Sequence, residues 1–167
     1  VRAVNPDHQF IEKSEIKEGR FINSLDIKNN TKNIVIGNLV VEDLFPNTNP
    51  VGKYLDLDKI KFKIVGVFVE RSEGSDSNEA RIIYMPISTA QKIYGNNDYI
   101  DQINLTYNKS LSEQEAIAFG NNIVDRIKDI FFVADNDQSA VRARNRAREN
   151  QEITQFNAIL AILVLII

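Results

Sequence analysis

The chain has 167 residues, of which 43% are hydrophobic and 26% are charged, and its formal net charge is −3. This composition is typical of a globular chain, and the slightly acidic balance argues against a protein that binds nucleic acid through phosphate contacts. Cysteine is absent, which excludes disulfides and thiolate metal sites.

The N-terminal part of the chain predicts a strand, a helix and a second strand. Val1–Val4 indicates the end of a strand, and the Asn-Pro-Asp that follows supplies a cap for a helix over Asp7–Ile16, closed by Gly19. Residues 23–33 are polar and rich in turn formers, so no regular element is expected there. The apolar run Ile34–Ile36 predicts a buried strand.

The next segment predicts a short helix and then a hairpin. Leu, Val and Asp residues at helical spacing favour a helix over residues 38–45, and the two prolines of residues 46–50 predict a loop. Apolar residues then follow strand patterns over Tyr54–Leu57 and Phe62–Val69. Asp58-Lys59 between them is the expected turn of a β-hairpin.

A strand and a helix are predicted again after a polar stretch. Arg81–Met85 is apolar after Arg81 and stops at Pro86, which predicts a strand. Ser88 and Gln91 have the spacing of a capping box, which predicts the start of a short helix that ends at Gly95.

The last predicted elements of the folded part are a strand and the clearest helix of the chain. Ile100–Tyr107 alternates apolar and polar residues, as a half-buried strand does. Ser112 with Glu115 forms a capping box for a helix to about Phe131, with one apolar stripe. Residues 131–134 are a candidate closing strand.

The chain ends in an apolar run. Residues 156–167 are apolar apart from Asn157, which predicts the start of a truncated transmembrane helix, since a span needs roughly 20 such residues. The alternative is a C-terminal helix that buries one face in the core. From Ser139 one helix is expected to pass through the arginines of residues 142–148, which indicate a solvated helix face rather than a nucleic-acid site. Because the chain opens on Val1, both ends are expected to be trimmed.

No catalytic, cofactor-binding or metal-ligating residue is predicted. His8 is the single histidine, and we expect it on the surface of a first helical turn. Asp135 and Asp137 begin like a calcium loop, but Ala140 replaces its glycine and Arg146 its bidentate glutamate. Since no phosphate-binding glycine loop occurs either, the sequence predicts no enzyme and no cofactor.

One polar loop is a candidate partner-contact site. The stretch from Arg71 to Glu79 is rich in serine and glycine, which predicts a mobile loop of the kind that carries binding residues. Its charged side chains Arg71, Glu73, Asp76 and Glu79 are the residues expected to meet a partner.

Several motifs occur in an order that resembles a known family. They are Gly19-Arg20-Phe21, Asp26, Ile36-Gly37, Leu44-Phe45, Pro50-Val51-Gly52-Lys53, Phe62-x-Ile64-Val65-Gly66-Val67, Ile83-Tyr84-Met85-Pro86 and Ser88-Thr89-Ala90-Gln91. The set resembles the periplasmic core domain of MacB-type ABC transporter permeases, a group that includes FtsX-like and LolC/LolE-like proteins. The resemblance covers roughly residues 1–155. Physically, the four glycines fall at element junctions, where positive φ or close backbone approach is expected.

The resemblance implies an α+β fold with two lobes. Residues 1–18 and 98–155 would form a porter-like βαβ lobe, and residues 19–97 an inserted β-rich lobe. A long C-terminal helix would lead from the first lobe into the transmembrane segment that starts at residue 156.

The resemblance also implies a function. The chain would be the extracytoplasmic domain of a permease in the bacterial cytoplasmic membrane, which couples cytoplasmic ATP hydrolysis to movement or export outside. Its partners would be an ATPase subunit or fused ATPase domain, a second permease copy, and a periplasmic adaptor or lipoprotein. The alternative is a binding module that captures a lipoprotein, peptide or drug, or that regulates a cell-wall hydrolase.

Overall fold

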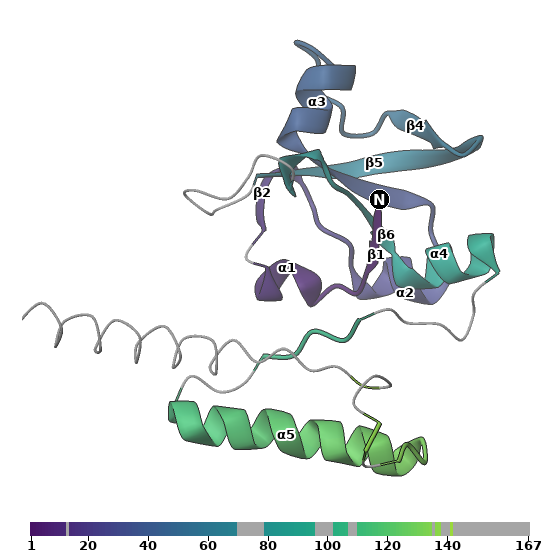
Figure 1. The fold of residues 1–167 in the computed structure, drawn as a ribbon. Coiled ribbons are helices and arrows are strands. Elements are labelled where there is room, and N and C mark those ends of the chain that lie inside the picture. The colour runs from purple at the N-terminus through teal and green to yellow at the C-terminus, as the bar shows by residue number, and fades with distance from the viewer. Residues whose placement is uncertain are drawn as a thin grey trace, which may run out of the picture. The chain divides into compact units, whose positions relative to one another are not determined.

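The chain divides into two compact units, Val1–Leu105 and Thr106–Ile167, in a computed structural model. The structure describes residues 1–12, 14–69, 79–95, 102–106, 110–134, 136–137 and 141. The first unit contains a mixed sheet with helices around it, and the second contains one described helix (Figure 1). The α+β class expected from the sequence is confirmed.

Six strands form a single sheet in the first unit. Its order is β1-β6-β3-β5-β2, and β4 pairs with the first half of β5. The pairs β1/β6 and β3/β5 are parallel, whereas the other pairs are antiparallel. The strands are β1 (Arg2–Val4), β2 (Glu15–Gly19), β3 (Asn33–Gly37), β4 (Tyr54–Leu57), β5 (Ile60–Val69) and β6 (Ile83–Pro86).

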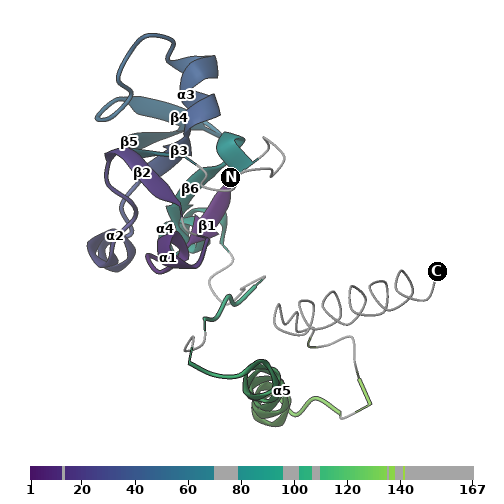
Figure 2. The same cartoon turned by 90° about the vertical axis from the view of Figure 1, so that its left-hand side faces the viewer.

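The described helices of the first unit are short, and the one described helix of the second unit is longer. Figure 2 shows α3 at one end of the sheet and α1, α2 and α4 at the other. The helices are α1 (His8–Ile11), α2 (Ser24–Asn29), α3 (Asn38–Leu44), η1 (Glu79–Arg81, a 3₁₀ turn), α4 (Ile87–Tyr94) and α5 (Glu113–Ile130).

The sheet separates two apolar clusters. On one face Ile36, Phe62 and Met85 are buried together with Val40 of α3 and are covered in part by α4. On the other face Phe21, Val35, Phe68 and Tyr84 form the second cluster, against which Ile27 of α2 packs. Adjacent residues therefore point to opposite clusters, as strand geometry requires, and burial of both faces stabilises the sheet.

The middle of the first unit matches the sequence prediction. The buried strand at Ile34–Ile36, the helix over residues 38–45 and the loop over residues 46–50 are confirmed by β3, α3 and the turn after them. The hairpin of β4 and β5 is also confirmed. Its turn residues Asp58 and Lys59 have φ values of 50° and 66°, and two positive φ values suit the twist of a hairpin.

The glycines of the family motifs stand where backbone freedom or close approach is required. Gly19 has φ of +71°, and Gly52 has φ of +90°. A side chain on Gly37 would overlap the carbonyl of Ala80, and one on Gly66 would overlap that of Arg20. Positive φ or close approach is confirmed for these four glycines, but Gly66 lies inside β5 rather than at an element junction.

The predicted helix over Asp7–Ile16 is wrong in its second half. Helix α1 covers only His8–Ile11, and Glu15–Gly19 forms strand β2 instead. Ile16 pairs with Phe68 of β5 and packs on the second cluster, so burial in the sheet overrides the local helical pattern. Gly19 accordingly ends a strand rather than a helix.

A helix occurs where the sequence analysis expected no regular element. Asn23 caps α2: its side chain accepts from the amides of Leu25 and Asp26, at 3.0 Å each. Asp26 completes the capping box by accepting from the Asn23 amide at 3.0 Å. The signal was present in the sequence as a capping asparagine followed three residues later by an acid, and the surrounding polar residues masked it.

The strand and helix after η1 are confirmed, but the predicted capping box is wrong. Pro86 is the N-cap residue of α4, and no side chain makes a capping hydrogen bond there. Gly95, with φ of +73°, ends the helix as predicted. The Ser88 hydroxyl donates to the carbonyl of Ile27 at 2.7 Å. The buried Thr89 hydroxyl likewise donates to the carbonyl of Thr31 at 2.8 Å, so these hydroxyls join α4 to the α2 segment.

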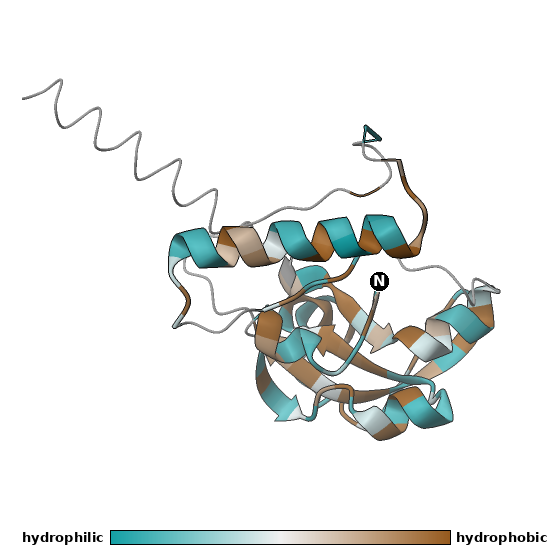
Figure 3. Cartoon of the chain, turned by 90° about the horizontal axis from the view of Figure 1, so that it is seen from below, coloured by the Kyte–Doolittle hydropathy of each residue, from teal (hydrophilic) through white to brown (hydrophobic). Residues whose placement is uncertain are grey.

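Helix α5 confirms the clearest sequence prediction, including its cap. The Ser112 hydroxyl accepts from the Glu115 amide at 3.3 Å, and the Glu115 carboxylate accepts from the Ser112 amide at 2.8 Å. Hydrophobic and hydrophilic residues follow one another along α5 as bands (Figure 3). The hydrogen bonds from Ser112 lower the pKa of the Glu115 carboxyl, as expected for a carboxylate at a helix N-terminus.

Two predicted strands are wrong in the described residues. Residues 102–106 of the predicted strand Ile100–Tyr107 have no regular structure, and residues 131–134 form a turn and an irregular segment. Ile103 is 63% exposed and Phe132 is 96% exposed. Neither segment pairs with a described strand, and alternation without a pairing partner does not make a sheet.

The predicted C-terminal helix lies outside the described residues, apart from Val141. The same holds for the apolar run at residues 156–167 and for the arginines of residues 142–148. Within the described ranges, no helix is both long enough and apolar enough to cross a bilayer.

Candidate functional site

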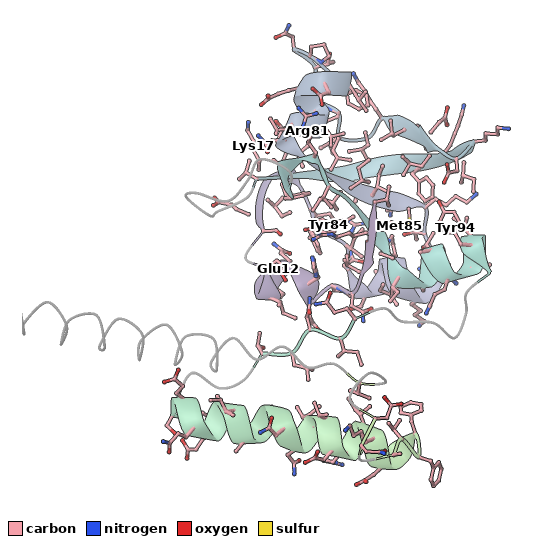
Figure 4. All side chains as sticks on the ribbon, in the orientation of Figure 1. Glu12, Lys17, Arg81, Tyr84, Met85 and Tyr94 are labelled. Atoms are coloured by element: carbon pink, nitrogen blue, oxygen red, sulfur yellow. The ribbon has the colours of Figure 1, made fainter. Side chains whose placement is uncertain are left out.

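The predicted contact loop leaves and re-enters the sheet at its α3 end. Arg71, Glu73 and Asp76 lie outside the described residues, and only the backbone of Glu79 is described, as the start of η1. The described anchors of the loop are the end of β5 at Val69 and η1 itself. Figure 4 shows Arg81 of η1 and Lys17 of β2 close to this end of the sheet.

The η1 anchor is fixed to both ends of α3. The Gly37 amide, just before α3, donates to the Ile82 carbonyl at 2.9 Å. Arg81 Nη1 forms an ion pair with Asp43 Oδ2 at 2.6 Å, although both side chains are more than half exposed. An exposed pair of this kind contributes little stability, so the backbone contact holds the anchor.

A groove of about 420 Å³ lies beside the anchor, between α3, the turn at residues 46–50 and β2. We call it the α3 groove. Its apolar lining comes from Val41 and Phe45 of α3 and from Val67 of β5. Lys17, Glu18 and Glu42 supply charged groups to the lining.

An irregularity in the β2/β5 pairing places Glu18 at this groove. Ile16 pairs with Phe68, but Glu18 pairs with Val67, so Lys17 is an extra residue in β2. Directly opposed residues share a face of the sheet. Phe68 and Val67 belong to opposite clusters, and the bulge therefore turns Glu18 to the face that α3 covers.

The Glu18 carboxylate has an unpaired atom. Glu18 is half-buried, and its Oε2 is buried without a hydrogen-bond partner among the described residues. Buried polar atoms are nearly always paired, and among the described residues this oxygen and His8 Nε2 are the exceptions.

A second polar cluster surrounds Asp26, whose side chain is 2% exposed. Arg20 donates to the carboxylate at 2.6 and 3.1 Å, and the Asn23 amide donates at 3.0 Å. Asn33 and Thr31 donate to Oδ1 at 2.7 and 2.8 Å. Burial alone would raise the pKa of this carboxyl, but the hydrogen bonds lower it well below its usual range. Its acceptor sites are occupied, so this cluster is structural.

His8 is not the surface residue that the sequence analysis expected. Its ring lies edge-on to Tyr84, with 4.9 Å between ring centroids, and it is half-buried. Burial lowers its pKa, whereas nearby Glu12 opposes that shift. The described residues hold no group of three or more acidic or imidazole side chains that could bind a metal ion.

The sequence analysis missed Glu18 as a site residue. A Lys-Glu pair in a strand has no sequence signal of its own, because only the bulge against β5 directs the carboxylate into the groove. The structure thus places the groove and the anchors of the predicted loop at one end of the sheet.

The family model described as "MacB-like periplasmic core domain" matches residues 1–149. The macrolide export ATP-binding/permease protein MacB of Chlorobaculum tepidum is 25% identical over 162 residues, which are 96% of this chain and 23% of the relative. The chain therefore spans about a quarter of the length of this relative.

Two solved structures share the fold. The periplasmic region of MacB from Actinobacillus actinomycetemcomitans has a TM-score of 0.62 and 17% identity, over 77% of this chain and 55% of that one. The extracellular domain of the noncanonic ABC-type transporter YknZ from Gram-positive bacteria has a TM-score of 0.64 and 19% identity, over 79% of this chain and 64% of that one. At these identities the likeness concerns the fold alone.

Proposed function

This chain belongs to the family of MacB-like periplasmic core domains, and from that membership we propose that it is the extracytoplasmic part of an ABC transporter permease. It would stand outside the bacterial cytoplasmic membrane and move in response to ATP hydrolysis inside the cell. The observation that supports the proposal most directly is the family match over residues 1–149.

The proposed partners follow from the same family. An ATPase subunit or a fused ATPase domain would supply energy, and a second permease copy would complete a dimer. A periplasmic adaptor or lipoprotein would meet the outer domain. The work of the domain is mechanical in this proposal, so the chain itself needs no catalytic residue.

The fold suits a mechanical part. Both faces of the sheet are covered, and hydrogen bonds from Thr89 and Ser88 join α4 to the segment around α2. The Asp26 cluster fixes the same segment to Arg20 and Asn33. Displacement of one edge of such a unit is carried to the other edge, because close-packed interiors deform little.

We retain the proposed division into lobes, with residues 1–18 and 98–155 in one lobe and residues 19–97 in the other. Strands β1 and β2 of the first segment pair with β6 and β5 of the second in a single sheet. In this proposal the β1/β6 and β2/β5 pairs of the sheet are the mechanical link between the two lobes.

A flexible insertion near Glu149 tests the mechanical role. We propose that the helix from Ser139 into the apolar run acts as a rod between domain and membrane. A short Gly-Ser segment inserted after Glu149 of the full-length transporter should abolish transport while ATP hydrolysis continues, since a flexible joint does not carry force. Substrate export and ATP hydrolysis are measured on the same membrane preparation.

The matched control is an insertion of equal length that favours helix, such as Glu-Ala-Ala-Ala-Lys. We expect this variant to retain a measurable part of transport. Full transport with the Gly-Ser insertion would reject the rod hypothesis.

A second candidate function is capture of a cargo or partner by the loop from Arg71 to Glu79. The observation that favours it is the fixed base of the loop, where Gly37 contacts the Ala80–Ile82 segment. Replacing residues 72–77 with a short glycine linker should lower the affinity for cargo at least tenfold, because Glu73 and Asp76, two of the four predicted contact residues, are lost. Cargo binding is measured on the full transporter, and unchanged affinity would dispose of this candidate.

The same loop also suits regulation of a cell-wall hydrolase, the other alternative from the family resemblance. A pull-down from envelope extract distinguishes cargo capture from hydrolase regulation, because a hydrolase and a lipid-modified cargo differ chemically. A hydrolase that is captured only by the chain with an intact loop would favour regulation.

A further inference from the structure

Helix α1 connects the two outer strands of the sheet. It follows β1 and precedes β2 in the chain, and these two strands stand at opposite ends of the sheet order. The ring of His8, the first residue of α1, lies edge-on to Tyr84 of β6, with 4.9 Å between the ring centroids. Because Tyr84 belongs to the second apolar cluster, this contact joins α1 to the core.

The other side chains of α1 contribute little to its position. The helix has only four residues, its N-cap Asp7 makes no side-chain capping hydrogen bond, and none of its residues is fully buried. Phe10 is 74% exposed. A single helical turn is unstable without tertiary contacts, so the position of α1 depends strongly on the contact between His8 and Tyr84.

The contact requires a neutral imidazole. Nε2 of His8 is buried and has no hydrogen-bond partner among the described residues. Both nitrogens of a protonated imidazole carry a hydrogen, so protonation would add a positive charge and leave a buried N–H without an acceptor. Burying an unpaired charge is costly, and that cost disappears when the ring moves into water.

The groups that face the ring oppose one another. Glu12, the C-cap residue of α1 (Figure 4), favours the protonated form, whereas Arg2 of β1 disfavours it. Tyr84 of β6 is the titratable residue in contact with the ring. Burial is the largest influence and lowers the pKa of His8 from its ordinary value of 6.5. His8 is the single histidine, so it is the one side chain of the chain whose ordinary pKa lies between pH 5 and 8.

We propose that His8 is an acid-sensitive latch, whose protonation releases α1 from Tyr84 and loosens the connection between β1 and β2. Because the pKa of His8 is lower when α1 is docked, the docked state is fully favoured above the ordinary value of 6.5 and is lost as the pH falls through the lowered value. The consequence for transport rests on the proposed function. A domain outside the membrane meets the pH of its surroundings, and acid would loosen the proposed link between the lobes.

An NMR titration of the full chain tests the latch. The ring signal of His8 is easily assigned, because the chain has no other histidine. We expect its midpoint below the ordinary value of 6.5. The nuclear Overhauser contacts between the rings of His8 and Tyr84 should weaken about tenfold between about one pH unit above the midpoint and one below it, because the neutral fraction falls by that factor. The amide signals of β3 should persist, since the release is local.

Three results of this titration would each overturn the latch. The first is a midpoint at or above the ordinary value. The second is a contact between the rings of His8 and Tyr84 that survives protonation. The third is loss of the β3 signals together with the contact, because the whole unit would then unfold instead of releasing α1.

His8→Phe is the matched variant, because it keeps an aromatic ring against Tyr84 but has no nitrogen to protonate. The amides of Ile11 and Glu12 donate to the carbonyls of Asp7 and His8 at 3.2 and 3.0 Å. In the unchanged chain their signals should shift with the His8 midpoint, and in His8→Phe this transition should be absent. An equal transition in the variant would assign the change to another group and overturn the latch. If the variant does not fold, the titration of the unchanged chain decides.

Both measurements are made on the chain itself. A failure of the latch therefore leaves the result of the Glu149 insertion untouched, and a failure of that insertion test does not alter the titration of His8.

Discussion

Replacing Asp26 with asparagine is expected to lower the free energy of unfolding of the first unit by about 2–3 kcal/mol. The substitution keeps the size of the side chain but removes the charge that Arg20 pairs with at 2.6 Å. It also turns one acceptor into a donor, which then faces the amide of Asn23 or the donors of Asn33 and Thr31. Urea unfolding followed by tyrosine fluorescence measures the change, because the chain has five tyrosines and no tryptophan.

Asp43→Asn is the matched control. Asp43 also pairs with an arginine at 2.6 Å, but its side chain is 51% exposed, whereas that of Asp26 is 2% exposed. Exposed ion pairs contribute about 0–1 kcal/mol. Equal effects of the two substitutions would show that burial of the Asp26 cluster does not stabilise the unit.

The same cluster makes the free energy of unfolding depend on pH in the acid range. The pKa of the Asp26 carboxyl is lower in the folded chain than the usual value of about 3.9, so folding favours its charged form. The stabilisation is therefore complete above the unfolded pKa and is lost as pH falls through the acid range, from about pH 5 downward. The unfolding free energy of Asp26→Asn should depend less on pH in that range than the free energy of the unchanged chain.

Gly37→Ala is expected to cost about 3 kcal/mol of unfolding free energy, through steric overlap rather than backbone strain. Gly37 has φ of −70°, which alanine adopts readily, but its Cβ would overlap the backbone carbonyl of Ala80. Either α3 or η1 must shift, and the backbone atoms on both sides leave little room. Thermal unfolding by circular dichroism measures the loss.

Gly95→Ala separates overlap from backbone strain. A Cβ at Gly95 meets nothing within 4 Å, although φ is +73°. We expect a cost of about 1 kcal/mol from the left-handed conformation alone. A loss in Gly37→Ala no larger than that of Gly95→Ala would mean that η1 moves aside freely, and the loop from Arg71 to Glu79 would then lack a fixed base.

Sequence rules predicted the structure correctly where the deciding interaction joins residues that are close together in the chain. The turn at Asp58-Lys59, the cap of α5 at Ser112 and the end of α4 at Gly95 depend on residues within a few positions of one another. The ordered motifs that resemble the MacB-type domains belong to the same class of evidence, and the family match over residues 1–149 confirms that reading.

The same rules failed where a distant strand decided the outcome. Glu15–Gly19 has a sequence compatible with helix, and pairing with β5 makes it a strand. Ile103 and Leu105 alternate as in a strand, yet no described strand pairs with them. Strand pairing depends on which backbone groups lie alongside, and one sequence pattern is compatible with several partners.

The sequence by itself determined the α+β class, the resemblance to MacB-type domains, most helix ends and the glycines at three element junctions. Only the tertiary structure decided the sheet order, the occupied acceptors of Asp26 and the turn of Glu18 into the α3 groove. The physical reason is the range of the interactions. Caps and turns are closed by residues a few positions apart, whereas the direction of a strand side chain depends on the register with a strand about fifty residues away along the chain.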